Sequence, residues 1–357
     1  MVDIIRDTFL SIVRLGIGHP TETISEIIDW KAINDLAAKQ GLSAIVVDGI
    51  ERLPDAKRPP KSHLLEWIGD VLQNYESRYI AYEKSLAELA AFYNEHGFKM
   101  MVLKGYACAL NWPKPEHRPC GDIDIWMFGQ QKDADETVCK ELGIKIDFSH
   151  HHHTVFQWRD FMVENHYDFV NIYDYKSSKE LEFVLKELGA DSNNSTVVFC
   201  EKVYLPSPNL HALFLLRHMV SHFASTRISL RQILDWGFFV EKQNSKIDWH
   251  WLLNLLSKYH MLEFFNCINA ICIEDLGFNK WLFPTAAVTP DLKDRVLNDI
   301  FNPKFVGEEP SEFFSRLWYK YRRWKGNWWK QDICYDESRW TGFWRGILYH
   351  LLKPSSL

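Results

Sequence analysis

The sequence lacks the features of a secreted, disulfide-bonded or membrane-spanning protein. Its seven cysteines are odd in number, scattered, and include no Cys-x-x-Cys pair, which is typical of reduced thiols in the cytoplasm. The N-terminus has no long apolar segment of the kind found in signal peptides. No stretch reaches the roughly 20 apolar residues that a membrane helix needs. The net charge of −6 argues against a broad nucleic-acid-binding surface but permits a local basic patch.

The composition is that of a globular protein with more than one structural region. Hydrophobic residues make up 46% and charged residues 25% of the 357 residues, and a chain of this length has room for two or three subdomains. Apolar residues recur at helical spacing before and after a central stretch of short apolar runs. We therefore expect an α+β fold in three parts: a helical region over 1–97, a small mixed-sheet domain over 98–205, and a helical domain over 206–357.

The central stretch predicts most of the mixed sheet. Short apolar runs predict strands at 100–103, 122–127, 144–146 and 197–203, and a hairpin of 154–158 with 161–166. An amphipathic helix is expected over 133–142, closed by Gly143. In the flanking regions, Asp29 is placed to cap the start of a helix that stops near Gly41.

Two aspartates, Asp122 and Asp124, stand two residues apart in one of these apolar runs. Alternate side chains of a strand share a face, so both carboxylates point one way while Ile123 and Ile125 point into a core. Two carboxylates this close repel each other, and a divalent cation relieves the repulsion. Since oxygen ligands of this kind suit Mg²⁺ or Mn²⁺, the pair predicts a site for one of these ions.

The residues around this pair resemble a known family. Residues 103–105 read Leu-Lys-Gly, Arg118 follows, and 121–125 read Gly-Asp-Ile-Asp-Ile. A glycine at a strand end, followed by Asp-hydrophobic-Asp on the next strand, resembles the nucleotidyltransferase superfamily of the DNA polymerase β type. Within this superfamily, the residue pattern is most similar to that of the bacterial uncharacterised nucleotidyltransferase-like family. In one departure, the superfamily's Gly-Ser pair, whose hydroxyl contacts triphosphate, reads Gly105-Tyr106 here.

The resemblance implies a nucleotidyltransferase-like enzyme that moves a nucleoside monophosphate from an NTP, such as ATP, to an acceptor that the sequence does not identify. Two metal ions about 4 Å apart align the attacking hydroxyl and neutralise the phosphoryl oxygens, which requires roughly three carboxylates. Asp122 and Asp124 supply two of them. For the third we expect Glu164, which precedes His166 at the acidic position of the family's motif, with Asp168 as second choice on the same face.

Lys104, Gly105 and Arg118 are the predicted nucleotide-binding residues. Lys104 can take the place of the missing serine at a phosphate, while Gly105 permits close backbone approach. The alternative for Lys104 is an exposed lysine without a role. Arg118 either clamps a phosphate through its planar guanidinium or is a surface arginine held by Glu116.

Two groups of histidines stand out. His150–His153 are consecutive and share no face in any regular structure, so we expect a solvated loop. His211, His218 and His222 recur at spacings of seven and four and form one stripe of a helix. Metal binding is one alternative for the stripe, and helix packing is the expected role.

The stretch from Arg316 to Lys330 holds six basic and six aromatic residues and no acidic one. Such a stretch can stack bases along a phosphate backbone or lie on an anionic membrane surface. The expected role is a helix whose aromatic residues pack inward under basic stems.

The rival to the enzyme hypothesis is a non-catalytic nucleotide- or RNA-binding module on the same fold. The missing serine after Gly105 favours this module, whereas the intact Asp122 and Asp124 pair favours the enzyme.

Overall fold

One mixed β-sheet organises the described part of the chain. The computed structural model describes residues 2–21, 24–25, 27–150, 152–172, 175–284, 287–305, 310–338 and 340. The strands within these residues are β1 (Met101–Val102), β2 (Ile123–Trp126), β3 (His153–Trp158), β4 (Phe161–His166), β5 (Ser195–Val198) and β6 (Glu201–Tyr204). Helices make up 61% of the described residues, and the predicted α+β fold class is confirmed.

The strands lie in the order β3-β4-β2-β1-β6-β5. Three pairs of neighbours are antiparallel (β1 with β2, β3 with β4, and β5 with β6), whereas β2 with β4 and β1 with β6 are parallel. The register of the β2–β4 pair sets Asp124 opposite Glu164. The two strands that carry the predicted carboxylates are therefore direct neighbours in the middle of the sheet.

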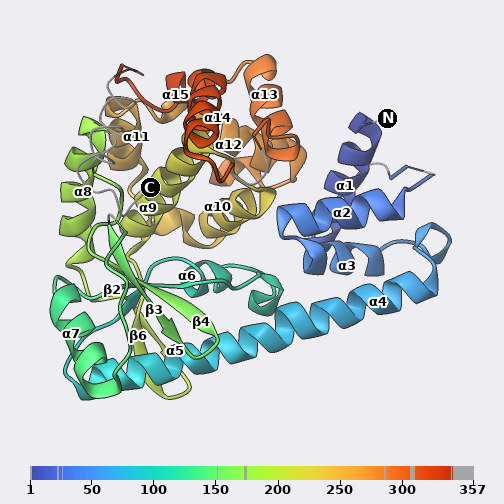
Figure 1. Cartoon of the computed structure of the whole chain (residues 1–357). Coiled ribbons are helices and arrows are strands. Elements are labelled where there is room, and N and C mark those ends of the chain that lie inside the picture. Colours follow the sequence, from blue (N-terminus) through green and yellow to red (C-terminus); the bar gives the residue numbers. More distant parts are fainter. Residues whose placement is uncertain are drawn as a thin grey trace.

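The N-terminal helices form a compact group and a long rod. The group consists of α1 (Val2–Gly16), α2 (Trp30–Gln40) and α3 (Ser43–Glu51). The rod consists of α4 (Lys61–Val71), a π-helical turn (Leu72–Glu76) and α5 (Ser77–Glu95), and it runs under both the group and the sheet (Figure 1). The predicted cap of α2 is confirmed, because Ala32 N donates to Asp29 Oδ1 at 3.0 Å and Gly41 is left-handed at φ 69°.

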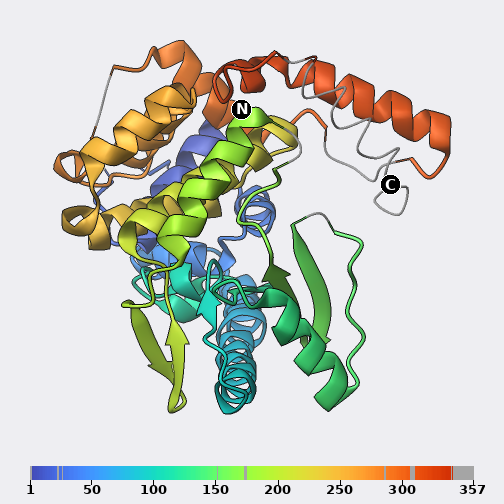
Figure 2. The ribbon, with the colours of Figure 1, turned by 90° about the vertical axis from the view of Figure 1, so that its left-hand side faces the viewer.

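The remaining helices lie between the strands and after them. Between the strands are α6 (Tyr106–Ala109), α7 (Gln131–Leu142) and α8 (Lys176–Gly189). After the sheet come α9 (Pro208–Ser225), α10 (Leu230–Gln243), α11 (Trp249–Lys258), α12 (Leu262–Ala270), α13 (Pro290–Phe301), α14 (Phe313–Gly326) and α15 (Trp328–Asp332). Figure 2 shows the rod end-on, with the β5–β6 hairpin on one side of it and the β3–β4 hairpin on the other. No helix in the described residues is both long and apolar enough to cross a membrane.

The two faces of the sheet belong to two different apolar cores. One core joins α5 and α7 to Val102, Ile123 and Ile125. The other contains Met101 and Leu103, and it unites α9 and α10 with the N-terminal helices α1 to α3. Because alternate residues of a strand face opposite ways, the carboxylates of β2 lie on the second face, toward α9. The second core combines both ends of the chain, and the three-part domain division stays a prediction.

Two predicted strands differ from the structure. Residues 144–146 form no strand, and only Asp147 beside them makes an isolated bridge, with Val155. The single strand expected over 197–203 is instead the β5–β6 hairpin. The chain reverses there because Phe199 and Cys200 both adopt positive φ, 45° and 73°, as a tight two-residue hairpin turn requires. The other predicted strands form, within one or two residues of the expected bounds.

Candidate active site

The acidic residues that the sequence singled out meet on one face of the sheet. β2 and β4 are parallel neighbours, and their register sets Asp124 beside Glu164. The period of two along each strand then directs Asp122 and His166 to the same face. Four residues from two strands thus converge, although about forty positions separate the two pairs in the sequence.

Asp124 is the buried centre of this group. Its Oδ1 accepts a hydrogen bond from Lys104 Nζ at 2.7 Å and lies 3.1 Å from His166 Nε2. Burial alone would raise the pKa of Asp124, but the charge of Lys104 and the hydrogen bond from His166 hold it well below its ordinary value. Asp124 is therefore an ionised carboxylate at neutral pH.

Glu164 shares His166 with Asp124. His166 Nε2 lies 3.5 Å from Glu164 Oε2, and His166 Nδ1 lies 3.2 Å from the carbonyl oxygen of Asp168. Burial lowers the pKa of His166, but its hydrogen bonds to Asp124 and Glu164 raise it above the ordinary value. Ligand atoms of Asp124, Glu164 and His166 all lie within 4.8 Å of one another, close enough to hold a metal ion. The sequence analysis placed His166 on this face by its alternation with Glu164 but assigned it no role.

Asp122 stands at the exposed start of β2. Its pKa is raised, first by partial burial and then by the negative charges of Glu164 and Asp124. Crowded carboxylates that disfavour one another's charge are the arrangement that a divalent cation relieves. The three carboxylates therefore fit Mg²⁺ or Mn²⁺, and His166 adds a nitrogen ligand beside them.

Lys104, directly after β1, connects the carboxylates to α9. Its ammonium lies 2.7 Å from Asp124 Oδ1 and 3.2 Å from His218 Nε2. Burial by itself would lower the pKa of Lys104, but Asp124 raises it, so the amine stays charged. Lys104 is thus a largely buried partner of Asp124 and not an exposed lysine.

The histidine stripe of α9 divides between two places. His218 Nε2 lies 3.1 Å from His222 Nε2, and burial together with the charge of Lys104 keeps the pKa of His218 well below 6.5. His211 lies elsewhere, 3.7 Å from Cys108 Sγ, and burial lowers its pKa to about 4. The stripe itself was visible in the sequence, but nothing in its spacing indicated that His218 contacts Lys104.

Gly105 and Tyr106 stand where the superfamily has its Gly-Ser pair, and contacts with α5 constrain both residues. Gly105 has φ 56° and ψ −100°, and a Cβ there would stand 2.7 Å from the hydroxyl oxygen of Tyr82. Only glycine fits both constraints. The Tyr106 hydroxyl donates to Glu83 Oε1 at 3.1 Å, and its ring stacks on Tyr79. The tyrosine side chain is therefore held by α5.

Arg118 is buried and fully engaged. Its Nε and Nη2 donate to the two oxygens of Asp235 on α10 at 2.7 and 2.9 Å, and Trp112 Nε1 donates to the same carboxylate at 2.8 Å. Arg118 is thus not a surface residue held by Glu116. The predicted phosphate contact would require its guanidinium to leave Asp235, and this role stays a prediction.

Asp168, the second choice for the third carboxylate, lies just beyond the end of β4. Its Oδ1 accepts a hydrogen bond from Lys186 of α8. The side chain is therefore paired with α8, whereas Glu164 faces Asp124.

The four consecutive histidines are not simply a solvated loop. His151 lies outside the described residues. His153 is the first residue of β3, is buried, and has its Nε2 3.9 Å from Glu164 Oε1. Register pairs it with His166 across the hairpin, a long-range contact that the local repeat could not predict.

The basic and aromatic stretch forms α14 and α15, and its two ends differ. Lys330 of α15 is buried, with Nζ 2.5 Å from Asp299 Oδ2, and Trp329 packs against the second core, which contains Met101 and Leu103. Trp318 of α14 is 61% exposed. The expected inward packing therefore describes Trp329 but not Trp318.

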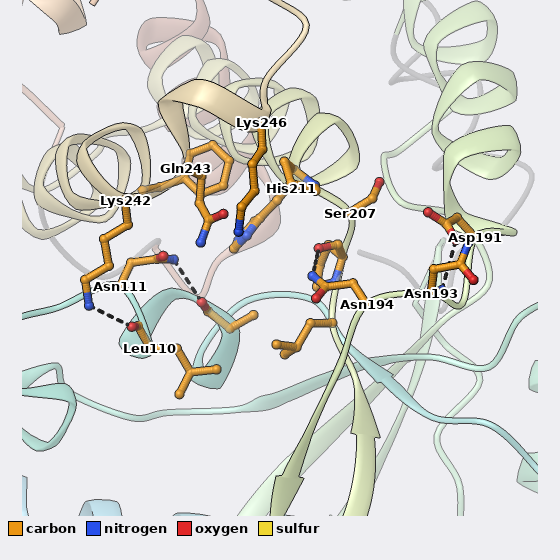
Figure 3. Close-up of a pocket in the computed structure, with 15 residues that line it drawn as sticks. Leu110, Asn111, Asp191, Asn193, Asn194, Ser207, His211, Lys242, Gln243 and Lys246 are labelled. Atoms are coloured by element: carbon orange, nitrogen blue, oxygen red, sulfur yellow. Dashed lines mark hydrogen bonds between the residues drawn. The ribbon is translucent and has the colours of Figure 1, made fainter. Parts of the chain in front are cut away.

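A separate cavity of about 410 Å³ lies between α6, the segment before α9, and α10 (Figure 3). His211, Lys242 and Lys246 line it, and Lys242 Nζ donates to the carbonyl oxygen of Leu110 at 3.1 Å. His211 precedes His218 by two turns of α9, so this cavity lies roughly 10 Å along the helix from Lys104. It is therefore distinct from the carboxylate cluster.

Comparison with known proteins identifies the class to which this fold and site belong. A family model described as an uncharacterised nucleotidyltransferase matches residues 26–276, more than half of the chain. The chain therefore belongs to that family, and a general nucleotidyltransferase-like function is supported. The match includes every residue of the carboxylate cluster. No curated protein and no solved structure matches the chain.

Proposed function

We propose that the protein is a Mg²⁺- or Mn²⁺-dependent nucleotidyltransferase that transfers a nucleoside monophosphate from an NTP, such as ATP, to a hydroxyl of an acceptor. One observation carries the proposal. Asp124 and Glu164 stand opposite each other on adjacent parallel strands, Asp122 directly precedes the first of these strands, and its pKa is raised first by burial and then by the charges of Glu164 and Asp124. This arrangement supplies the roughly three carboxylates that two-metal phosphoryl chemistry requires.

Each residue has a defined part in this proposal. Asp122 and Asp124 hold the metal ions, and Glu164 completes the position that activates the acceptor hydroxyl. Lys104 now neutralises Asp124. Once Asp124 ligates a metal ion, the ammonium is free to meet a nucleotide phosphate. The nucleotide contact predicted for Gly105 stays a prediction, because the Tyr82 hydroxyl occupies the space beside that glycine. Direct phosphate contact by Arg118 is the weakest part, because Asp235 occupies its guanidinium.

The alternative, a non-catalytic nucleotide- or RNA-binding module, has one observation in its favour. Tyr106 replaces the superfamily's serine, and its hydroxyl is directed to Glu83 on α5. A site without that hydroxyl can still bind a nucleotide but has one fewer contact to the triphosphate.

We also propose that the protein is cytoplasmic. All seven cysteines are free, in keeping with that location.

Substitution of the carboxylates tests the enzyme proposal. Incorporation of labelled NTP is measured in parallel with the thermal shift produced by Mg²⁺-NTP. Asp122→Asn, Asp124→Asn and Glu164→Gln should each lower transfer by on the order of 10²–10³-fold or more, because each removes charge that the metal ions need. Asp122→Asn should also abolish the Mg²⁺-dependent part of the thermal shift.

Asp168→Asn is the matched control, since it makes the same change in a carboxylate that pairs with Lys186. It should leave the incorporation of labelled NTP and the Mg²⁺-NTP thermal shift close to their values in the unaltered protein. If Asp122→Asn keeps the full Mg²⁺-NTP shift, the metal site lies elsewhere. Nucleotide or RNA binding that is independent of Mg²⁺, with no transfer, would support the binding module instead.

A further inference from the structure

Three histidines converge beside the carboxylate cluster. His152 directly precedes β3, His153 begins it, and His166 ends the antiparallel neighbour β4, where register pairs it with His153. The ring centroids lie 4.5 Å apart for His152 and His153, 5.7 Å for His152 and His166, and 5.3 Å for His153 and His166. One ring nitrogen of each lies within 4.8 Å of the other two. The hairpin therefore brings three imidazoles around one point.

The surroundings of His153 leave one of its buried ring nitrogens unexplained. Its Nδ1 is buried and makes no hydrogen bond to any described residue. Burial of a polar atom without a hydrogen-bond partner is unfavourable, so such an atom calls for an explanation. On its other side, His153 Nε2 lies 3.9 Å from Glu164 Oε1, beyond hydrogen-bond distance.

His166 is already oriented as a metal-binding histidine would be. Its Nδ1 lies 3.2 Å from the carbonyl oxygen of Asp168, which can accept the Nδ1 proton. That contact fixes the ring with its proton on Nδ1, so that Nε2, which faces Asp124 at 3.1 Å, offers its lone pair to a metal once it gives up its proton.

We propose that His152, His153 and His166 form a binding site for a late first-row divalent ion, with Zn²⁺ the best fit. Imidazole nitrogen suits Zn²⁺, Co²⁺, Ni²⁺ and Cu²⁺, whereas Mg²⁺ takes oxygen ligands. Zn–N bonds of about 2.0–2.1 Å in a tetrahedron set the nitrogens roughly 3.4 Å apart, so small side-chain rotations close the remaining distance. Glu164 or a water molecule takes the fourth position.

This site adjoins the proposed Mg²⁺ site: His166 lies beside both, and Glu164 belongs to both when it takes the fourth position. His166 also belongs to the group with Asp124 and Glu164. A histidine whose Nε2 binds zinc no longer donates from that atom to Asp124, so occupancy of the histidine site alters the carboxylates beside it. The inference does not depend on nucleotidyl transfer, because the three imidazoles bind an ion whether or not the chain is an enzyme.

Titration of the metal-stripped full-length protein with Co²⁺ tests the proposal. Co²⁺ stands in for Zn²⁺ and gives visible absorption bands in tetrahedral sites; excess Mg²⁺ is present to occupy the carboxylates. One equivalent of Co²⁺ should bind with tetrahedral bands, and Zn²⁺ should displace it. His153→Ala should weaken Co²⁺ binding at least tenfold. His152→Ala, at a partly exposed position, should do the same.

His150→Ala is the matched control, because His150 belongs to the same run and stacks on His153, with ring centroids 4.7 Å apart, yet is not a member of the three-histidine group. It should leave Co²⁺ affinity unchanged, and so should Asp122→Asn, which removes a carboxylate of the proposed Mg²⁺ site. If His150→Ala and His153→Ala weaken Co²⁺ binding equally, the proposed three-histidine site is wrong, since any run of histidines would then suffice. Absence of tetrahedral bands, or loss of Co²⁺ binding in Asp122→Asn but not in His153→Ala, would also overturn it.

Discussion

Two groups of charged side chains in the protein are built differently. In the first, Arg118 and Asp235 form a two-pronged ion pair, each side chain is 7% exposed, and Trp112 donates to the same carboxylate. In the second, Lys104 and His166 face three carboxylates. The first group is closed because every carboxylate oxygen has a donor. The second has more negative charge than the protein neutralises, which is the condition for binding a cation.

The closed pair should show the largest effect on stability. Asp235→Asn leaves the Arg118 guanidinium buried without its counter-charge, and breaking such a pair costs about 3–5 kcal/mol. The free energy of unfolding from urea denaturation measures the loss. The double variant Arg118→Met with Asp235→Leu should recover most of it, because an apolar replacement of both partners is often neutral. A loss below about 1 kcal/mol in Asp235→Asn would mean that the pair is not closed as described.

The open group should respond differently at its two aspartates. Asp124→Asn weakens the hydrogen bonds to Lys104 and His166, so the free energy of unfolding should fall by about 2 kcal/mol. Asp122→Asn is the matched comparison. Because Asp122 is exposed and repelled by its neighbours, its loss should change stability by less than about 0.5 kcal/mol or raise it slightly. Urea denaturation without divalent ions measures both free energies of unfolding. A larger loss in Asp122→Asn than in Asp124→Asn would show that Asp122, and not Asp124, is the aspartate whose contacts stabilise the fold.

The smallest expected effect concerns pH and the loop that carries Arg118. His117 Nδ1 lies 2.6 Å from Asp48 Oδ2. Burial would lower the pKa of His117, but Asp48 raises it above 6.5; burial would raise the pKa of Asp48, but His117 and Lys114 hold it below 3.8. The ion pair of His117 with Asp48 therefore stabilises the fold fully between pH 3.8 and pH 6.5, the ordinary pKa values of the two groups. It is lost as pH rises through the raised pKa of His117 or falls through the lowered pKa of Asp48.

The His117→Gln variant checks this window. The difference in the free energy of unfolding between His117→Gln and the unaltered protein should be greatest near pH 5 and should shrink above the raised pKa of His117. A difference that stays constant from pH 5 to pH 9 would show that the contact of His117 with Asp48 does not depend on the histidine charge.

The open group was easier to predict from the sequence than the closed pair. Asp122 and Asp124 lie on one strand and Glu164 on another, and the period of two is a local property that a sequence displays. Arg118 and Asp235 are 117 positions apart. The loop context suggested a phosphate ligand or a surface residue for Arg118, because no local pattern indicates that α10 supplies a buried carboxylate.

By itself, the sequence determined the local elements: the cap of Asp29, the helix end near Gly41, the strand that carries Asp124 directly after Asp122, and the hairpin that carries Glu164. These follow from backbone geometry and side-chain period over a few residues. Only the tertiary structure decided which charges became partners. The contact of Lys104 with His218 depends on how α9 packs on the sheet, and the contact of His153 with Glu164 depends on how β3 pairs with β4. Burial of apolar area favours this arrangement, and it joins residues that are far apart in the sequence, which no short window of sequence contains.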